Sequence, residues 1–189
     1  IIDTVAPSAP TLTGTSPAND NTPALTGVAD ANATVTAYSG ETALGQATAD
    51  ANGAYSLVVA TLADGSHSLN VKATDSAGNT SSASTVLVMV VDTIAPGTPT
   101  LTGTSPSSTS TPVLSGIAEA SATVTILSGN ASLGQASADA SGNYTFTPGT
   151  ALSDGTYSLT ATASDAAGNT GASSVAFSLL VDTVVPDAP

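Results

Sequence analysis

Short runs in which apolar and polar residues alternate fill this chain, and no segment shows the 3.6-residue period of a helix. One such run contains Leu69, Val71 and Ala73, with a polar residue between each apolar residue and the next. A two-residue period places such residues on one face of a β-strand. Turn-forming residues fill the segments between the runs. The first half of the chain therefore predicts strands at Thr11–Gly14, Ala24–Ala29, Thr34–Ser39, Leu44–Ala49, Ala54–Val59, Ser66–Thr74 and Ser84–Val91.

The whole series of runs repeats in the second half of the chain. The last run of the first half, Val86–Val91, is apolar throughout, but its counterpart contains the polar Ser178. The polar Ser178 marks the outward-facing positions of this strand. Leu87, Met89 and Val91 correspond to the opposite face and are therefore predicted to point into the core. Seven strands in about 90 residues are typical of an immunoglobulin-like sandwich. The predicted fold is all-β, with two tandem immunoglobulin-like seven-stranded β-sandwiches.

One six-residue phrase marks the start of each repeat, and it reads IDTVAP, then VDTIAP, then VDTVVP. Its aspartates recur 89 and then 90 residues apart. We therefore expect one domain at residues 1–91, a second at 92–181, and the start of a truncated third repeat at 182–189. Prolines in and after the phrase predict a stiff, extended connection. The chain is accordingly expected to be a piece of a longer array.

The chain carries 14 acidic residues against one lysine, Lys72, so its net charge is −13. This charge argues against nucleic acid and anionic membrane as partners, because both attract basic surfaces. No apolar run reaches the roughly 18 residues of a membrane span. Cysteine is absent, so disulfides contribute nothing. The predicted partners are neighbouring repeats of the same chain, in a monomeric rod that makes no membrane contact in this region.

Most acidic residues recur at matching positions of the two repeats. The loops after the second, fourth and sixth strands return to the end where the chain enters, so their acids should gather there with the linker aspartate. Crowded carboxylates repel one another, and calcium relieves this by accepting roughly 6–8 oxygen ligands. Magnesium suits an all-protein cage less well, and zinc prefers histidine or cysteine. The residues concerned are Asp3, Asp30, Asp50 and Asp75 in the first repeat, and Asp92, Glu119, Asp139 and Asp165 in the second.

A turn is the alternative role for these aspartates. The segments from Asp50 and from Asp139 fit type I turns, with aspartate first and glycine fourth. Asp64 and Asp154, each followed by glycine, belong to the opposite end and suit tight turns. We favour the turn for these four residues, with calcium ligation as the second interpretation. For the linker acids and those after the second and sixth strands we favour calcium, because a proline-rich linker offers no turn to cap and Glu119 caps turns poorly.

Other notable residues favour structural roles. Tyr55 and its counterpart are expected in the core. Gly27, near the end of the second strand, predicts a bulge or tight bend. Asn79 is expected at a left-handed turn position. The one histidine, His67, aligns with a tyrosine and is expected to be a solvated strand residue. With no nucleophile motif and no single pair of acids, the sequence predicts no catalysis.

The segments DTxxPxxP, GxAD or GxAE, LGQ and DxAGNT occur in this order in both halves. With them the whole chain resembles the bacterial immunoglobulin-like repeats of giant surface adhesins exported by type I secretion (repeats-in-toxin adhesins). The resemblance implies tandem extender domains that hold a ligand-binding tip away from the cell, with calcium rigidifying the array between domains. It implies an extracellular location at the bacterial cell surface. The ligands it implies are Asp3 and Asp92, Asp30 and Glu119, and Asp75 and Asp165.

The sequence thus predicts structural extender repeats of a bacterial surface adhesin, rigidified by calcium at the interdomain junctions. The alternative is a carbohydrate- or protein-binding immunoglobulin-like module of a secreted protein or enzyme. Such a site should break the repeat symmetry with an exposed aromatic cluster, and none is evident in the sequence.

Overall fold

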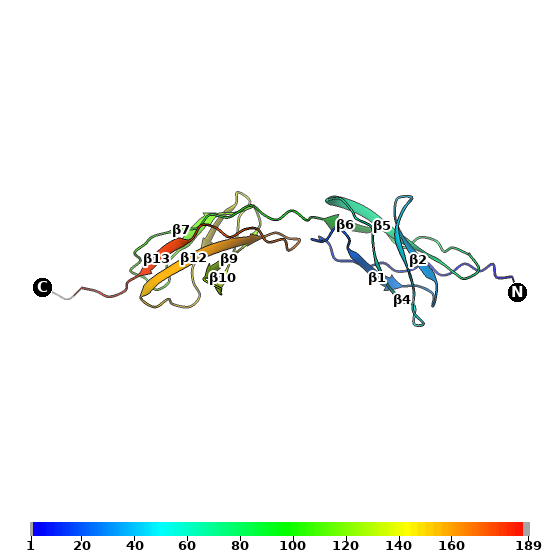
Figure 1. The fold of residues 1–189 in the computed structure, drawn as a ribbon, viewed down its shortest axis with the longest axis horizontal. Coiled ribbons are helices and arrows are strands. Elements are labelled where there is room, and N and C mark those ends of the chain that lie inside the picture. The colour runs from blue at the N-terminus through cyan, green and yellow to red at the C-terminus, as the bar shows by residue number, and fades with distance from the viewer. Residues whose placement is uncertain (1, 187–189) are drawn as a thin grey trace. The chain divides into compact units, whose positions relative to one another are not determined.

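The computed structural model describes residues 2–186. The chain divides into two compact units, residues 1–93 and 94–189, and each is built of β-strands over its described residues (Figure 1). Of the expected third repeat, residues 187–189 lie outside the described residues. A search of the described residues finds no helix with the length and apolar character needed to span a membrane.

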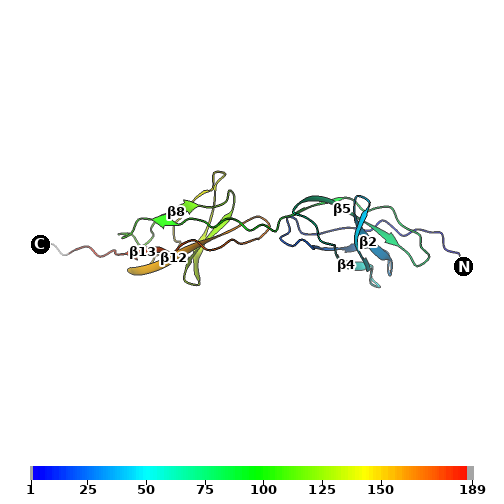
Figure 2. The ribbon, with the colours of Figure 1, turned by 45° about the horizontal axis from the view of Figure 1, so that its top comes forward.

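Two antiparallel sheets form the first unit. β1 pairs with β4, and the larger sheet has the order β3-β2-β5-β6, so β2 lies beside β5 (Figure 2). The strand predicted at Thr11–Gly14 extends the smaller sheet through a bridge between Thr13 and Thr26. The strands are β1 (Ala24–Val28), β2 (Thr34–Ser39), β3 (Thr42–Thr48), β4 (Ala54–Val58), β5 (Gly65–Thr74) and β6 (Leu87–Val91).

The second unit repeats this topology, and here the first strand is complete enough to form a ladder. Its smaller sheet has the order β11-β8-β7 and its larger sheet the order β10-β9-β12-β13. The strands are β7 (Thr102–Gly103), β8 (Leu114–Ile117), β9 (Thr123–Ser128), β10 (Ala131–Ser137), β11 (Asn143–Phe146), β12 (Gly155–Ser164) and β13 (Phe177–Val181). The prediction of two tandem immunoglobulin-like sandwiches is confirmed.

The core of each unit lies between its two sheets, as the alternation predicts. Leu69, Val71 and Ala73 of β5 are fully buried. On β6, Met89 and Val91 are buried and Leu87 is partly buried against the same cluster. The predicted phase of the last strand is therefore correct, because burying one face of a strand fixes the phase of all its side chains.

The last strand begins at Leu87, three residues later than predicted. The hydroxyl oxygens of Ser81 and Ser84 accept hydrogen bonds from the backbone N–H groups of Ala73 and Val71. These buried side chains take the place of ladder partners, so the segment before Leu87 follows β5 without forming a regular strand.

Gly27 does not form the predicted bulge, because the β1–β4 register is unbroken. Its lack of a side chain instead allows other parts of the chain to lie close to it. A Cβ atom at Gly27 would lie 2.1 Å from the carbonyl oxygen of Thr11 and 2.6 Å from the hydroxyl of Tyr55. Tyr55 is buried, as predicted, and its hydroxyl donates to the Thr11 carbonyl. Glycine is needed here so that the incoming chain can reach the tyrosine.

Candidate functional site

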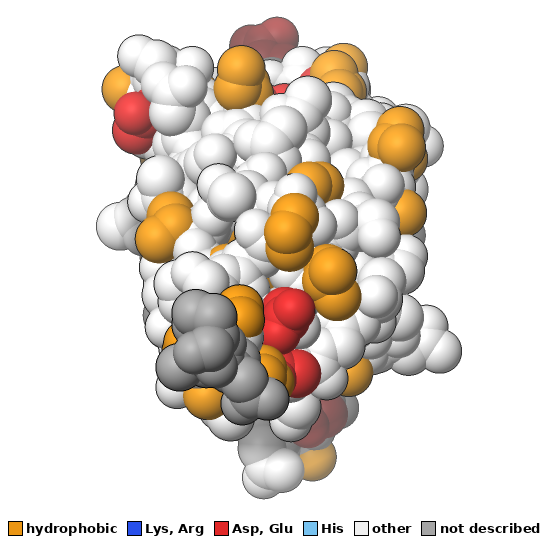
Figure 3. Space-filling view, turned by 90° about the vertical axis from the view of Figure 1, so that its left-hand side faces the viewer, with side chains coloured by type: hydrophobic (Ala, Val, Ile, Leu, Met, Phe, Trp, Pro, Cys, Tyr) orange, Lys and Arg blue, Asp and Glu red, His pale blue; other side chains and the backbone are white. Residues whose placement is uncertain are grey.

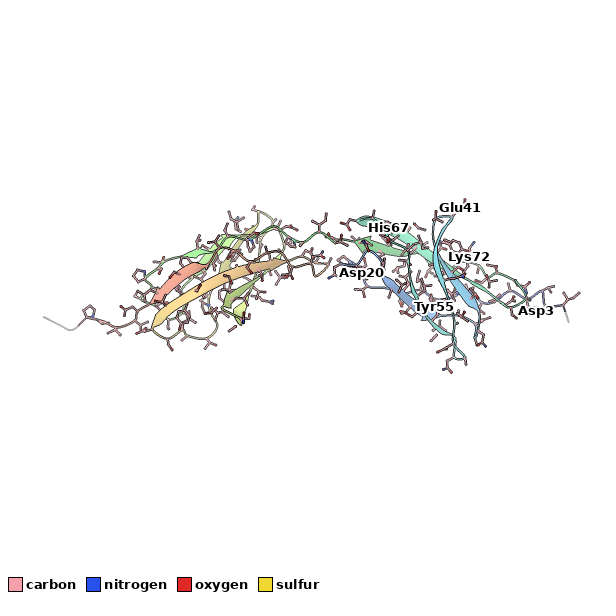
Figure 4. The ribbon with its side chains drawn as sticks, in the orientation of Figure 1. Asp3, Asp20, Glu41, Tyr55, His67 and Lys72 are labelled. Atoms are coloured by element: carbon pink, nitrogen blue, oxygen red, sulfur yellow. The ribbon has the colours of Figure 1, made fainter. Side chains whose placement is uncertain are left out.

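Two loops and the linker surround a hollow at the N-terminal end of the first unit. The hollow has a volume of about 410 Å³, and Asp3, Asp30 and Asp75 line it. Asp30 follows β1 and Asp75 follows β5. Alternating connections of a sandwich return to the same end, so these loops meet the incoming linker. Figure 4 shows Asp3 at this end of the unit and Asp20 at the other.

Hydrogen bonds fasten the linker to these loops. A carboxylate oxygen of Asp30 accepts the Ser8 N–H at 3.2 Å. The side-chain amide of Asn79 donates to the main-chain carbonyl of Asp3 at 3.2 Å. The carboxylate of Asp3 accepts the Val5 N–H at 3.0 Å. The first two bonds therefore hold the linker on the sandwich, and the third lies within the linker.

Asp75 is the carboxylate of this group with the most hydrogen-bond partners. One oxygen accepts the N–H groups of Ala77 and Asn79, both at 2.9 Å, and the other accepts the Asn79 side-chain amide at 2.9 Å. The Asn79 amide and these N–H groups lower the pKa of Asp75 below its usual value. The predicted left-handed position falls on Gly78, with φ of +91°, and not on Asn79. Gly78 turns the loop because it has no Cβ, and this leaves the Asn79 side chain free to fasten the linker.

The donor chemistry of the hollow fits calcium, because three carboxylates and nearby carbonyl groups offer only oxygen. In residues 2–186, no three histidine, cysteine, aspartate or glutamate side chains lie close enough to hold an ion as they stand. Asp30 and Asp75 also accept the N–H groups described above. Binding of an ion would therefore require carboxylate rotation toward the centre of the hollow.

The corresponding acids of the second repeat divide between the units. Asp92 belongs to the first unit, and Glu119 and Asp165 belong to the second. Glu119 lines a shallow hollow of about 400 Å³ together with Thr98 and Thr100. Burial raises the pKa of Asp165, but hydrogen bonds from Asn169 and from the loop N–H groups outweigh it and lower that pKa overall. Asp165, which follows β12, is thus held in the same way as Asp75, which follows β5.

Asp50 and Asp139 occupy turns and lie outside the hollows described above. The carbonyl of Asp50 accepts the Gly53 N–H at 2.9 Å, and its carboxylate accepts the N–H groups of Asn52 and Ala54. Asp139 repeats this arrangement, and the N–H groups of its turn lower its pKa. The turn role therefore accounts for every contact of these two carboxylates described here.

Asp64 and Asp154 lie at the opposite end of their units, each bonded to the outgoing chain. The carboxylate of Asp64 accepts both the N–H and the hydroxyl of Thr93, and Asp154 accepts the same groups of Thr183. Sequence reasoning missed this pairing. The available signal was an Asp-Gly dipeptide followed by an Asp-Thr dipeptide, with the paired residues 29 positions apart in both repeats.

No lysine or arginine lines the hollow of the first unit. The only lysine, Lys72, lies on β5 with its ammonium 5.7 Å from the centre of the Tyr38 ring. That cation–π contact holds the one lysine beside Tyr38 on the sheet, and Lys72 does not line the hollow. Acidic side chains also lie among uncharged and apolar ones on the face shown in Figure 3. An external cation would therefore meet little competition from within the protein.

The family of bacterial Ig-like domains matches residues 3–93 and 100–183, and the chain belongs to this family as two tandem domains. The fibronectin(III)-like modules of Clostridium thermocellum CbhA share its fold, with a TM-score of 0.58 and 18% identity over 91% of this chain and 93% of that one. Comparison with curated proteins finds no match.

Two further solved structures match the chain at lower overall similarity. One is a tetra-tandem repeat in the extending region of a large adhesion protein, with 26% identity, a TM-score of 0.40, and coverage of 94% of this chain and 50% of that chain. The other is the BSP domain of a biofilm-associated protein, with 21% identity, a TM-score of 0.39, and coverage of 93% and 30%. This chain thus spans half or less of either structure.

Proposed function

We propose that the two domains are structural extender repeats of a bacterial surface adhesin, and that calcium stiffens the connection between consecutive repeats. The observation that carries this proposal is the hollow in which Asp3 of the linker meets Asp30 and Asp75 of the sandwich. One ion held by all three would tie the linker to its domain. Membership in the bacterial Ig-like family and the repetition of the same acids support the proposal.

Calcium suits this hollow better than other common ions. It accepts roughly 6–8 oxygen ligands in flexible geometry, so carboxylates that stand apart can close around it. Magnesium is smaller and retains its water molecules, and zinc prefers nitrogen or sulfur ligands. Calcium would also offset the repulsion between carboxylates that have no lysine or arginine beside them.

The second junction is proposed by analogy with the first. Asp92, Glu119 and Asp165 match Asp3, Asp30 and Asp75 in sequence. We infer that these three acids bind an ion in the same way. The upstream Asp92 belongs to the first unit, so such an ion would link one domain to the next. A series of such links would produce an extended array with neighbouring repeats as its main partners.

An extended array of this kind suits an extracellular position, where calcium is available and a binding tip must reach away from the cell. The net charge of −13 supports this placement, because it disfavours both nucleic acid and anionic membrane as partners. In this proposal the region carries no catalytic function.

The distance distribution between the two domains tests the proposal. Spin labels at single cysteines replacing Ser56 and Ser158 would report it by electron resonance, because both serines are exposed. Calcium should narrow the distribution, and chelator should broaden it. The distance distribution of the Asp92→Asn variant should remain broad in calcium. The distribution of the matched turn variant Asp139→Asn should narrow as in the wild type. Equal widths with and without calcium would contradict the proposal, and a strong glycan-array signal would favour a carbohydrate-binding module instead.

A further inference from the structure

The outgoing chain of each unit is bonded to a single carboxylate. The Thr93 N–H donates to Asp64 Oδ1 at 3.1 Å, and the Thr93 hydroxyl lies 3.0 Å from Oδ1 and 3.2 Å from Oδ2. In the second unit, the Thr183 N–H and hydroxyl lie 3.0 Å and 2.8 Å from Asp154 Oδ1. We call each Asp–Thr pair an exit latch. Because both latches lie within their own units, each can be considered without reference to the other.

Strand register brings the two residues of each latch together. Gly65, the first residue of β5, pairs with Val91, the last residue of β6, and β12 and β13 end in the same way. Asp64 therefore comes just before one strand, and Thr93 comes just after its partner. Gly65 has φ of +130°, in the region that favours glycine.

Further contacts support both partners of the latch. The Asp92 N–H donates to the Ala18 carbonyl at 2.9 Å, so the chain is already held one residue before Thr93. On the other side, His67 Nε2 lies 2.7 Å from the carbonyl oxygen of Ala63, next to Asp64.

The second unit makes equivalent contacts with different residue types. There the Tyr157 hydroxyl donates to the Ser153 carbonyl at 2.9 Å, and the Asp182 N–H donates to the Ser107 carbonyl at 2.9 Å. Histidine and tyrosine thus serve the same purpose, which is to brace the loop that carries the latch aspartate.

We propose that Asp64 and Asp154 are positioning residues that fix the path of the main chain as it leaves each sandwich, without a metal ion. One carboxylate accepts hydrogen bonds from both the N–H and the hydroxyl of one threonine, and this restrains the backbone and the side chain of that threonine together. Bonds to a charged acceptor are stronger than neutral ones, and a β-branched side chain already has few rotamers. The inference rests on the proposed spacer function, because a spacer benefits when fewer residues can rotate between its domains.

The exit latch of the first unit and the hollow lined by Asp3, Asp30 and Asp75 lie at opposite ends of that unit. At the second junction Thr93 directly follows the proposed ligand Asp92, so the two contributions are separated there by measuring the latch without calcium. Calcium would act where a linker joins the following sandwich, and the latch acts where the chain leaves the preceding one. Asp64 and Asp154 thereby receive a role that requires no ion. Bending between domains would then be confined to residues after Thr93.

Amide hydrogen exchange measured by nuclear magnetic resonance in chelator tests this inference. In Asp64→Ala, the Thr93 amide should exchange about tenfold faster, as expected for the loss of one charge-assisted hydrogen bond, and the Thr183 amide should not change. Asp154→Ala is the matched control, in which the Thr183 amide should exchange faster and the Thr93 amide should not change. Thr93→Ser keeps both donors and should retain protection, whereas Thr93→Val keeps only the N–H bond and should retain part of it.

Two results would overturn the inference. One is a Thr93 amide without protection in wild-type protein under chelator, and the other is an exchange rate unaffected by Asp64→Ala. The Met89 amide should stay protected in every variant and shows that the sandwich is folded. If Asp64→Ala unfolds the unit, Thr93→Val decides alone, and unchanged exchange in that variant contradicts the latch. Because chelator is present throughout, failure of calcium binding would leave these results unaffected.

Discussion

The hydroxyl of Tyr55 donates a hydrogen bond to the main-chain carbonyl of Thr11, which lies 44 residues earlier in the sequence. Tyr144 and Thr100 form the same pair in the second unit. Each bond fixes the incoming chain to the sandwich just after the proline-rich linker. Removing the hydroxyl would leave a carbonyl without this partner. We therefore expect Tyr55→Phe to lower the free energy of unfolding of the first unit by about 1–3 kcal/mol, measured by urea denaturation.

The same tyrosine predicts a loss of stability at high pH. Burial raises the pKa of Tyr55 to about 12, from 10.0. The folded state therefore favours the protonated phenol, and its contribution is fully present below pH 10 and is lost as pH rises toward 12. Denaturation at pH 9 and at pH 11 should show this loss. The Tyr55→Phe, Tyr144→Phe double variant should lose less stability over the same interval, and equal losses would contradict the assignment.

Gly27→Ala should disrupt the same contact sterically. The added Cβ would lie 2.1 Å from the Thr11 carbonyl oxygen, so either the incoming chain or Tyr55 must move. Overpacking of this kind costs about 1–3 kcal/mol. Gly97→Ala is the matched control, because nothing lies within 4 Å of its Cβ position. Denaturation midpoints should shift for the first variant only, and similar shifts in both would refute the steric explanation.

Asn79→Ala should raise the pKa of Asp75, because the Asn79 side chain is the largest cause of its lowered value. A carboxyl with a lowered pKa stabilises the fold above its unfolded value near 3.8, and that contribution is lost as pH falls through the lower folded value. Carboxyl titration followed by nuclear magnetic resonance measures the pKa directly. Asp20 is the internal control, because Thr22 lowers its pKa and should still do so in this variant.

Calcium should stabilise the protein against heat, because an ion that binds only the native state shifts unfolding by mass action. At a calcium concentration about 100 times the dissociation constant, the expected gain is about 2.7 kcal/mol. Scanning calorimetry in chelator, in calcium and in magnesium would show it, with calcium giving the highest melting temperature. Identical melting curves in chelator and in calcium would contradict a role for the ion.

The strands and their buried faces were predictable because the two-residue alternation is local. The last strand needed its counterpart around Ser178 to fix its phase, since the first copy is apolar throughout. The role of Gly27 was not predictable, because it depends on Thr11 and Tyr55 meeting at one point in space. The bond between Asp64 and Thr93 was not predictable for a similar reason, since the two residues lie in different segments 29 residues apart.

The acidic hollow was largely predictable, because sandwich topology brings alternate loops to one end. The sequence did not show that Asn79 fastens the linker, or that Asp30 and Asp75 already accept backbone N–H groups. Those contacts depend on loop conformation. Asp50 was expected at the same end with a turn as its favoured role, and its carboxylate does accept the N–H groups of its own turn.

Calcium titration by isothermal calorimetry on chelator-treated protein tests the central claim most directly. We predict two ions per chain, one held by Asp3, Asp30 and Asp75 and one by Asp92, Glu119 and Asp165. Asp30→Asn combined with Asp75→Asn should remove one of them, whereas Asp50→Asn and Asp182→Asn should remove none. Absence of calcium binding heat, or unchanged stoichiometry in the Asp30, Asp75 double variant, would contradict the account.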